Sequence, residues 1–454
     1  MRQTIEMARH RVFVRGVALA LVGVVAACDV TNPGPIREEF VGDEEAQVGL
    51  IYGTQRQIAE VYTDNAFDFA LIGREVFPGG QIGAWGNPVQ IHAGHVEPDY
   101  DNGSFDNLHT ARFIAETAIA RFTEAGASDA RMFQAHVWAG YTYRILGEWW
   151  CHTVLPGPDV TSPEPEPSEY IPDTTAPYFQ RAVDNFTAAL TYAATDDERN
   201  AAYAGRAQAN LWLGNWADAL ADASAVVVTN PLFRFVSMND PSETPLYNYI
   251  YEANSGTFRS YTVQFTWFED YYTTTGDPRT PWTTDPDFAV AVGSLSGFGQ
   301  VPYKPQRKFT SRTQDVNLAS HWEMKLIQAE AILRGAGSGA YADALDLINE
   351  VRTRNVSDND GQPLPALAAA DATETWTHLK RERRVELWLE GRAAPDERRW
   401  AATSAPGTLD IPTWENPSDP GYTQLFVDYP RENLCFDIPE SERDRNPNVP
   451  STGG

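Results

Sequence analysis

Residues 203–231 read YAGRAQANLWLGNWADALADASAVVVTNP, and this stretch decides how the chain folds. Its key positions are Tyr203, Ala207, Gly214, Trp216, Ala219 and Pro231. Small residues at these intervals lie where two antiparallel helices touch, and the large aromatic residues wedge between the helices. The stretch therefore predicts one antiparallel helix pair.

This spacing is typical of a tetratricopeptide unit. Weaker copies of the pattern occur at Gly140-Tyr143-Gly147-Trp149 and at Tyr341-Ala344 with Val351. The alternative is a set of Ala-rich helices that match by coincidence. Helix pairs of this kind cannot bury their apolar faces alone, so they stack on one another. The predicted fold class is mainly α, with tetratricopeptide-type helix pairs in a right-handed superhelix and with long aromatic-rich loops.

Outside the repeats, apolar residues recur at helical spacing in residues 44–62, 108–122 and 132–146. Residues 79–103 are rich in Gly, Pro, Asn and aromatic residues and predict an ordered loop, whereas the Pro-rich residues 156–177 predict an exposed, semi-rigid loop. Residues 231–313 form a long insertion that is poor in helix signals. A segment of that length is usually functional or disordered, and its aromatic residues favour order.

The N-terminus predicts export and anchoring. An Arg-rich stretch precedes an apolar run, residues 16–27, that is shorter than the roughly 20 residues a membrane-spanning helix needs. The run ends in Val25-Ala26-Ala27-Cys28, and small residues before a cysteine are typical of a bacterial lipoprotein signal. We expect residues 1–27 to be a signal peptide, Cys28 to carry the lipid, and residues 28–454 to form a single domain that begins with a polar tether. The alternative is an ordinary secretory signal followed by an incidental cysteine.

The charge narrows the range of partners. The chain has a formal net charge of −27, and removal of the Arg-rich leader makes the mature chain more negative still. Such a surface repels phosphate backbones and anionic headgroups, so nucleic acid is an improbable partner and the lipid must hold the protein at a membrane. After lipidation of Cys28, Cys151 and Cys435 remain. They form either a disulfide or two free buried thiols, because the sequence does not supply the separation of their Cα atoms.

Short motifs in a fixed order point to a family. They are Cys28-Asp29 followed by Asn32-Pro33, residues 143–150, Gly276-Asp277-Pro278-Arg279, residues 324–333, 348–352 and 382–391, and Phe436-Asp437-Ile438-Pro439 followed by Asn446-Pro447. In this order the chain resembles the SusD/RagB family of nutrient-binding surface lipoproteins over nearly its whole mature length. One departure is that Ala393 stands where the family usually has an Arg, with Arg392 one place earlier. Because Pro395 lacks a backbone donor, we expect the helix to kink or end there.

The resemblance implies a mostly helical fold and a place on the outer face of the outer membrane. It also implies a partner, a SusC-like TonB-dependent transporter, and capture of oligosaccharides, or in some branches peptides, for import. The expected function is therefore that of a non-enzymatic binding protein. The alternatives are a lipid-anchored tetratricopeptide scaffold that holds a protein or peptide partner and, more remotely, a glycoside hydrolase.

A sugar site needs flat aromatic rings for stacking and short polar groups for hydrogen bonds. The loop segments supply five candidate ligand-binding residues, Trp85, Trp267, Tyr271, Tyr272 and Trp282. For each of them the alternative is a core position, since large aromatic side chains are mostly buried. Five other tryptophans lie in helical stretches and are interpreted as packing residues: Trp149, Trp212, Trp216, Trp388 and Trp400.

Other chemical signals are weak. His92 and His95 lack a third ligand nearby, and residues 358–361 match only part of a calcium loop, so neither a metal site nor a cofactor is predicted. The triplet Glu382, Glu386 and Glu390 stands at four-residue steps beside arginines. That arrangement predicts an ion-paired helix face and not a general acid/base pair.

Overall fold

The computed structural model describes residues 44–80, 91, 95–96, 100, 102–156, 167–240, 246–255, 257–291, 300–409 and 434–451. The chain divides into two compact units, Met1–Gly49 and Leu50–Gly454. Every element named below lies in the second unit, apart from the first residues of helix α2. Cys28 lies outside the described residues.

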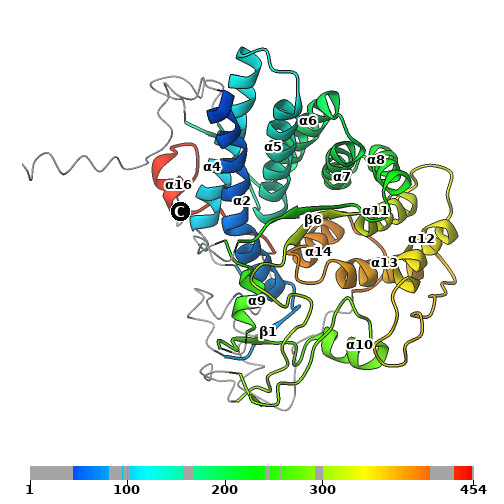
Figure 1. The fold of residues 1–454 in the computed structure, drawn as a ribbon. Coiled ribbons are helices and arrows are strands. Elements are labelled where there is room, and N and C mark those ends of the chain that lie inside the picture. The colour runs from blue at the N-terminus through cyan, green and yellow to red at the C-terminus, as the bar shows by residue number, and fades with distance from the viewer. Residues whose placement is uncertain are drawn as a thin grey trace, which may run out of the picture. The chain divides into compact units, whose positions relative to one another are not determined.

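Helices dominate the described residues, as the sequence predicts. The helices are α2 (Glu44–Ile72), α4 (Asn102–Glu124), α5 (Ala130–Trp149), α6 (Ala176–Tyr192), α7 (Asp196–Leu213), α8 (Trp216–Thr229), α9 (Tyr249–Ala253), α10 (Trp267–Thr275), α11 (His321–Leu333), α12 (Tyr341–Thr353), α13 (Ala372–Glu386), α14 (Ala393–Ala402) and α16 (Glu440–Arg445). From α5 to α8, and on to α11 and α12, each packs on the next (Figure 1). Within the described ranges, no helix combines the length and the apolar character that a membrane span requires.

The strands are short. They are β1 (Phe77–Pro78), β2 (Thr153–Leu155), β3 (Glu169–Ile171), β4 (Arg234–Ser237), β5 (Tyr261–Thr262) and β6 (Val316–Ser320). Among the described residues they form three antiparallel two-stranded sheets, which pair β1 with β5, β2 with β3, and β4 with β6. The described ends of residues 156–177, predicted as a loop, therefore contribute strand β3 and the start of α6.

The helix pair predicted from residues 203–231 is α7 and α8. Gly214 ends α7 in the left-handed conformation, with φ of 73°, which a glycine adopts without strain. Phe186 of α6 wedges between two glycines of its neighbours. A Cβ atom on Gly205 would lie 2.2 Å from the ring of Phe186, and a Cβ atom on Gly140 of α5 would lie 2.7 Å from it. The packing is consistent with tetratricopeptide units, in which small residues admit large rings.

The core uses the helical tryptophans as predicted. Trp149, Trp388 and Trp400 are almost fully buried, and Trp212 and Trp216 are half-buried and pack against the main core. The predicted helices of residues 44–62, 108–122 and 132–146 are each present and are longer than the periodicity indicated.

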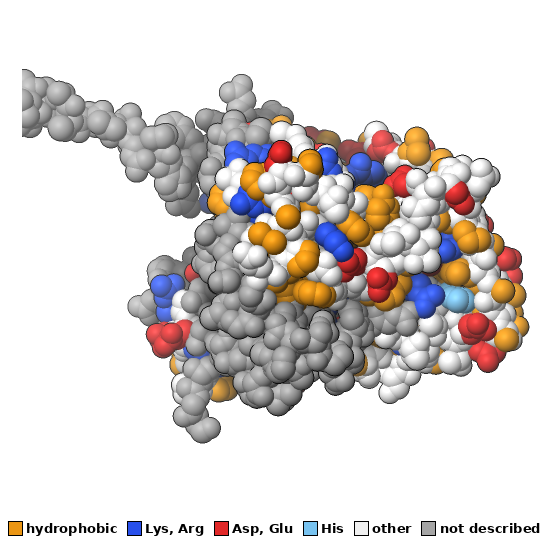
Figure 2. Space-filling view, turned by 90° about the horizontal axis from the view of Figure 1, so that it is seen from below, with side chains coloured by type: hydrophobic (Ala, Val, Ile, Leu, Met, Phe, Trp, Pro, Cys, Tyr) orange, Lys and Arg blue, Asp and Glu red, His pale blue; other side chains and the backbone are white. Residues whose placement is uncertain are grey.

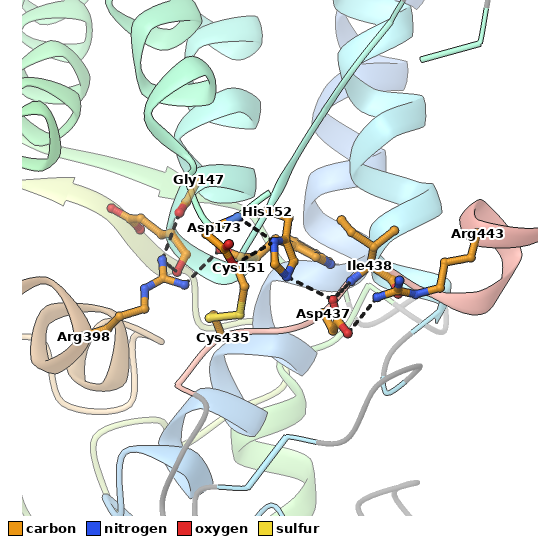
Figure 3. The surroundings of a disulfide bond; sticks show 11 residues. Gly147, Cys151, His152, Asp173, Arg398, Cys435, Asp437, Ile438 and Arg443 are labelled. Carbon is orange, nitrogen blue, oxygen red and sulfur yellow. Dashed lines mark hydrogen bonds and ion pairs between the residues drawn. A yellow bond between two sulfur atoms is a disulfide. The ribbon is translucent and has the colours of Figure 1, made fainter. Parts of the chain in front are cut away.

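A disulfide joins Cys151, two residues after α5, to Cys435 in the C-terminal segment, with their Cα atoms 5.3 Å apart (Figure 3). The alternative of two free thiols is therefore excluded. Polar contacts surround the bond: Nε2 of His152 lies 3.3 Å from Oδ1 of Asp437, and Arg443 pairs with the other oxygen of that carboxylate at 2.7 Å. The bridge and these contacts hold the C-terminal segment against the end of α5.

The expectation of a helix that ends or kinks at Pro395 is wrong. Helix α13 already ends at Glu386, and Pro395 is the third residue of the new helix α14. A proline is tolerated in the first turn because backbone N–H groups there have no intrahelical acceptor. Arg392 stands just before this helix and is buried, where it pairs with Glu148 at 3.2 Å and with Glu323 at 2.9 Å.

Candidate binding surface

Helix α10 positions three of the predicted aromatic residues. Gly276 ends the helix with φ of 61°, and a Cβ atom there would lie 2.6 Å from the backbone nitrogen of Asn359, so the tight approach requires glycine. Trp267 and Tyr271 stand four residues apart on one face of the helix, and their rings stack with centroids 4.4 Å apart. The close fit at Gly276 fixes the direction in which these rings point.

Tyr271 is buried beneath Trp267. Its hydroxyl group donates to Oδ2 of Asp277 at 2.7 Å and accepts from Nη1 of Arg352 at 3.0 Å. Burial, together with the nearby Glu382 carboxylate, raises the pKa of Tyr271 well above its ordinary value, so the hydroxyl stays protonated. In this structure Tyr271 supports the ring of Trp267, which is half-buried.

Tyr272 and Trp282 form a second aromatic pair at the same helix. Their ring centroids lie 6.1 Å apart at an interplanar angle of 63°, and both side chains are half-buried. The Tyr272 hydroxyl donates to Asp358 at 2.9 Å, and burial together with this contact raises its pKa to about 12. The Trp282 ring nitrogen donates to the backbone oxygen of Glu269 at 3.3 Å, and Nζ of Lys304 lies 5.0 Å from the ring centroid.

The structure thus gathers Trp267, Tyr271, Tyr272 and Trp282 around α10. The α10 aromatic surface, as the term is used below, consists of the three half-buried rings, Trp267, Tyr272 and Trp282. The fifth predicted residue, Trp85, lies outside the described residues. The helix itself lies in a segment that was predicted as poor in helix, because nine residues between Thr266 and Gly276 give too short a periodic signal.

Sequence reasoning missed a groove of about 760 Å³ beside helix α9. It is lined by Tyr251, Glu252, Ser255, Thr257, Arg259, Phe288, Ser311 and Arg312, a set called the α9 groove below. The side on which α9 and α10 lie in Figure 1 is seen face-on in Figure 2, where hydrophobic side chains stand among side chains of both charges. The only sequence signal for this groove is the long aromatic-rich insertion, residues 231–313, which contains all of its lining residues.

Aromatic rings and charged groups alternate along the α9 groove. The guanidinium of Arg259 lies 3.7 Å from the ring centroid of Phe288, a stacked arrangement. Arg312 donates from Nε to Glu252 at 2.5 Å and makes a second contact with the other oxygen of that carboxylate. The backbone N–H of Phe288 donates to Asp285 at 3.2 Å, which holds the exposed ring in place.

One segment, residues 281–291, contributes to both surfaces. Isolated antiparallel bridges join it to residues 301–307 and pair Trp282 with Gln306 and Val290 with Pro302. Trp282 of the α10 aromatic surface and Phe288 of the α9 groove therefore lie on the same segment. Six residues separate them, so at about 3.3 Å per residue they are at most about 20 Å apart along the chain.

This arrangement suits recognition of a polyhydroxylated ligand. The exposed ring of Phe288 and the half-buried ring of Tyr251 offer apolar surface. The hydroxyl groups of Ser255, Thr257 and Ser311 and the Glu252–Arg312 pair offer donors and acceptors at the same groove. In the part of the chain that the structure describes, no three His, Cys, Asp or Glu side chains are arranged to hold a metal ion. His92 lies outside that part.

The acidic triplet is ion-paired, as predicted, but not on a solvated helix face. Glu382 is buried and pairs with Arg279 and with Arg352, both at 2.8 Å. Glu386 also pairs with Arg279, and Glu390 lies beyond the end of α13. These ion pairs fasten the Gly276–Arg279 turn, and with it helix α10, to α12 and α13.

We compared the sequence and the fold with those of known proteins. Residues 322–452 match the model of the SusD family, and no curated protein matches the chain in sequence. A SusD homolog from Bacteroides thetaiotaomicron shares the fold with a TM-score of 0.65 at 15% identity, over 89% of this chain and 96% of that one. Surface glycan-binding protein A from Bacteroides uniformis has a TM-score of 0.59 at 16% identity, over 89% and 98% of the two chains.

A laminarin-binding SusD-like protein has a TM-score of 0.56 at 15% identity, over 90% of this chain and 99% of that chain. The agreement therefore extends over nearly the whole length of each solved structure, although few residues are identical. The chain therefore shares the SusD fold, and its residues 322–452 match the SusD family model.

Proposed function

We propose that this protein is a non-enzymatic glycan-binding protein that captures oligosaccharides at the α9 groove and the α10 aromatic surface. The observation that carries the proposal is the α9 groove, where an exposed ring, a half-buried ring, hydroxyl groups and a charged pair share one cavity of about 760 Å³. Two of the SusD-like proteins that share its fold are a surface glycan-binding protein and a laminarin-binding protein. Because residues 281–291 contribute to both surfaces, the pair suits a chain of several sugar units better than a single sugar.

A glycan panel followed by calorimetry tests this proposal. We expect an oligosaccharide to bind, and Phe288→Ala to weaken its binding by about 1–3 kcal/mol because a stacking ring is lost. Phe113→Ala is the matched control, since Phe113 is another exposed phenylalanine, on helix α4 and outside both surfaces. If no oligosaccharide binds while peptides do, the sugar assignment fails. Release of free sugar during the incubation would overturn the non-enzymatic assignment.

We also propose that the captured glycan passes to a SusC-like TonB-dependent transporter in the outer membrane. The support is the shared SusD fold and the match of residues 322–452 to the SusD family model, together with the N-terminal sequence, in which Cys28 follows small residues. Lipid attachment at Cys28 would hold the protein at the cell surface. Radiolabelled fatty acid should label the wild-type chain and not Cys28→Ser, and fractionation should place the labelled protein in the outer membrane.

Isolation from the native membrane distinguishes this proposal from the alternative of a tetratricopeptide scaffold for a protein or peptide. A cavity of about 350 Å³ at the repeat helices, lined in part by Phe133, Phe233 and the exposed Leu232, gives the scaffold alternative a physical place. A stable complex with a large β-barrel transporter supports delivery of a glycan. Recovery without a transporter, together with peptide binding abolished by Leu232→Asp, favours the scaffold.

A further inference from the structure

Phe265 is an exposed aromatic residue that belongs neither to the α9 groove nor to the α10 aromatic surface. It stands two residues before helix α10 and is 38% exposed. Its ring makes a T-shaped contact with the buried ring of Phe77 in strand β1, with the two centroids 5.3 Å apart. Because more than a third of Phe265 still faces solvent, packing on Phe77 does not account for the whole side chain.

The backbone places Phe265 at a position that favours glycine or asparagine. Residues 263–266 form a turn, which is closed by the backbone N–H of Thr266 donating to the oxygen of Val263 at 3.0 Å. Phe265 is the third residue of this turn, and its φ is 68°, in the left-handed region. Glycine or asparagine ordinarily meets this requirement, whereas a bulky aromatic residue there is an outlier that costs stability.

The usual structural reason for an apolar residue just before a helix does not apply to Phe265. Thr266 is the N-cap of α10, so Phe265 stands one residue before the cap, where an apolar side chain commonly packs on the fourth residue of the helix. In α10 that fourth residue is Asp270, which offers no apolar partner. Strained residues cluster at binding sites, where the strain serves to present a side chain. The strained turn therefore favours a role for the Phe265 ring in binding.

An ion pair connects Phe265 to Trp282 of the α10 aromatic surface. One oxygen of the Glu269 carboxylate accepts from the backbone N–H of Phe265 at 2.8 Å, and the other pairs with Nζ of Lys304. The same Nζ lies 5.0 Å from the ring centroid of Trp282. A carboxylate accepts several hydrogen bonds and an ammonium group donates three, so adjacent hydroxyl groups of a sugar match the two groups. Two rings beside such a pair suit a pyranose unit, which has both apolar C–H faces and hydroxyl groups.

We propose that Phe265 is a further ligand-binding residue, whose ring forms one subsite for a pyranose unit together with the Trp282 ring and the Glu269–Lys304 pair. This inference rests on the proposed function, because it adds a residue and a subsite to the glycan site proposed above. The subsite extends the α10 aromatic surface toward β1, where Phe77 supports the Phe265 ring.

Hydroxyl-radical footprinting of the wild-type chain tests the inference directly. The probes are cello-, xylo-, manno- and malto-oligosaccharides, each used at a saturating concentration once calorimetry has shown that it binds. We expect a bound oligosaccharide to lower the labelling of both Phe265 and Trp282 by about twofold or more, because a contact excludes water from each ring. Phe113, an exposed phenylalanine on helix α4, is the internal reference and should keep its labelling. Unchanged labelling of Phe265 while an oligosaccharide is bound, or an equal decrease at Phe113, overturns the inference alone.

Phe265→Leu is the decisive variant, since leucine keeps an apolar cover on Phe77 and the same backbone strain but has no flat ring. It should weaken binding about tenfold and melt within about two degrees of wild type. Phe265→Tyr keeps the ring and should bind within about twofold of wild type. Phe113→Leu, the matched control, removes an exposed ring elsewhere and should bind as wild type does.

The outcomes separate this inference from the proposed function. Wild-type binding by Phe265→Leu overturns the inference and leaves the proposed function standing. If Phe265→Leu melts much lower than wild type, the footprint of the wild-type chain decides the matter. Absence of binding by every oligosaccharide overturns the proposed function and this inference with it.

Discussion

Replacing Gly205 by alanine tests the helix packing on which the fold depends. The new Cβ atom would lie 2.2 Å from the Phe186 ring, and the ring cannot retreat because Gly140 closes its other side, where a Cβ atom would lie only 2.7 Å away. Overpacking of this kind costs about 1–3 kcal/mol, whereas the higher helix propensity of alanine returns about 1 kcal/mol. We expect Gly205→Ala to lower the free energy of unfolding by up to about 2 kcal/mol.

Urea denaturation followed by circular dichroism measures this change, and Gly53→Ala is its control. Gly53 also lies within a helix, but a Cβ atom there would lie 3.7 Å from Ile114, an ordinary contact. That variant should be neutral or more stable by up to about 1 kcal/mol. Phe186→Leu in the Gly205→Ala background should recover part of the loss, because the smaller side chain makes room. If Gly205→Ala stabilises the protein as much as Gly53→Ala does, the wedge interpretation is refuted.

Three further predictions concern buried polar groups and the disulfide. Burial outweighs the nearby cations and raises the pKa of Glu75 to about 8, from about 4.5 in the unfolded chain. The contribution of Glu75 to the free energy of unfolding is therefore fully present below pH 4.5 and is lost as the pH rises toward 8. Glu75→Gln should flatten this decline in thermal melts between about pH 5 and pH 8. Replacing both Cys151 and Cys435 by serine should cost about 2–5 kcal/mol of unfolding free energy, with the same loss in wild type after reduction. Tyr271→Phe should cost about 1–3 kcal/mol, because Arg352 and a buried carboxylate lose their shared hydroxyl partner; an unchanged urea midpoint would contradict that role.

The helix pairs could be predicted because their contacts leave a local record. Gly214 and Ala219 stand at intervals set by the helix period, so a pattern of 29 residues is enough to predict the α7–α8 pair. Contacts between distant residues leave no such record. The pairing of Cys151 with Cys435 spans 284 residues, and the Phe186 wedge joins three helices that the repeat pattern treats separately. Pro395 was misread because the end of α13 at Glu386 is a tertiary outcome.

The sequence predicted candidate ligand-binding residues by segment, and the structure shows where they lie. Four of the five aromatic candidates lie around α10, and whether they bind a ligand stays a prediction. Whether each ring is accessible depends on partners elsewhere in the chain: Tyr271 is buried since Asp277 and Arg352 hold its hydroxyl. The α9 groove brings together Tyr251 and Arg312, which are 61 residues apart in the sequence. The turns and isolated backbone bridges that do this are not predicted by any short sequence pattern.

Many of the arginines form ion pairs inside the fold. Arg279, Arg352, Arg383, Arg392 and Arg399 are buried, and each pairs with a carboxylate in the seam between the helices. Because each of these buried pairs is neutral, the excess negative charge of the chain falls on its other side chains, most of which lie at the surface. Such a surface repels an anionic ligand unless a local cation offsets the repulsion. A neutral glycan meets no such repulsion, so the salt dependence of binding separates a charged ligand from a neutral one.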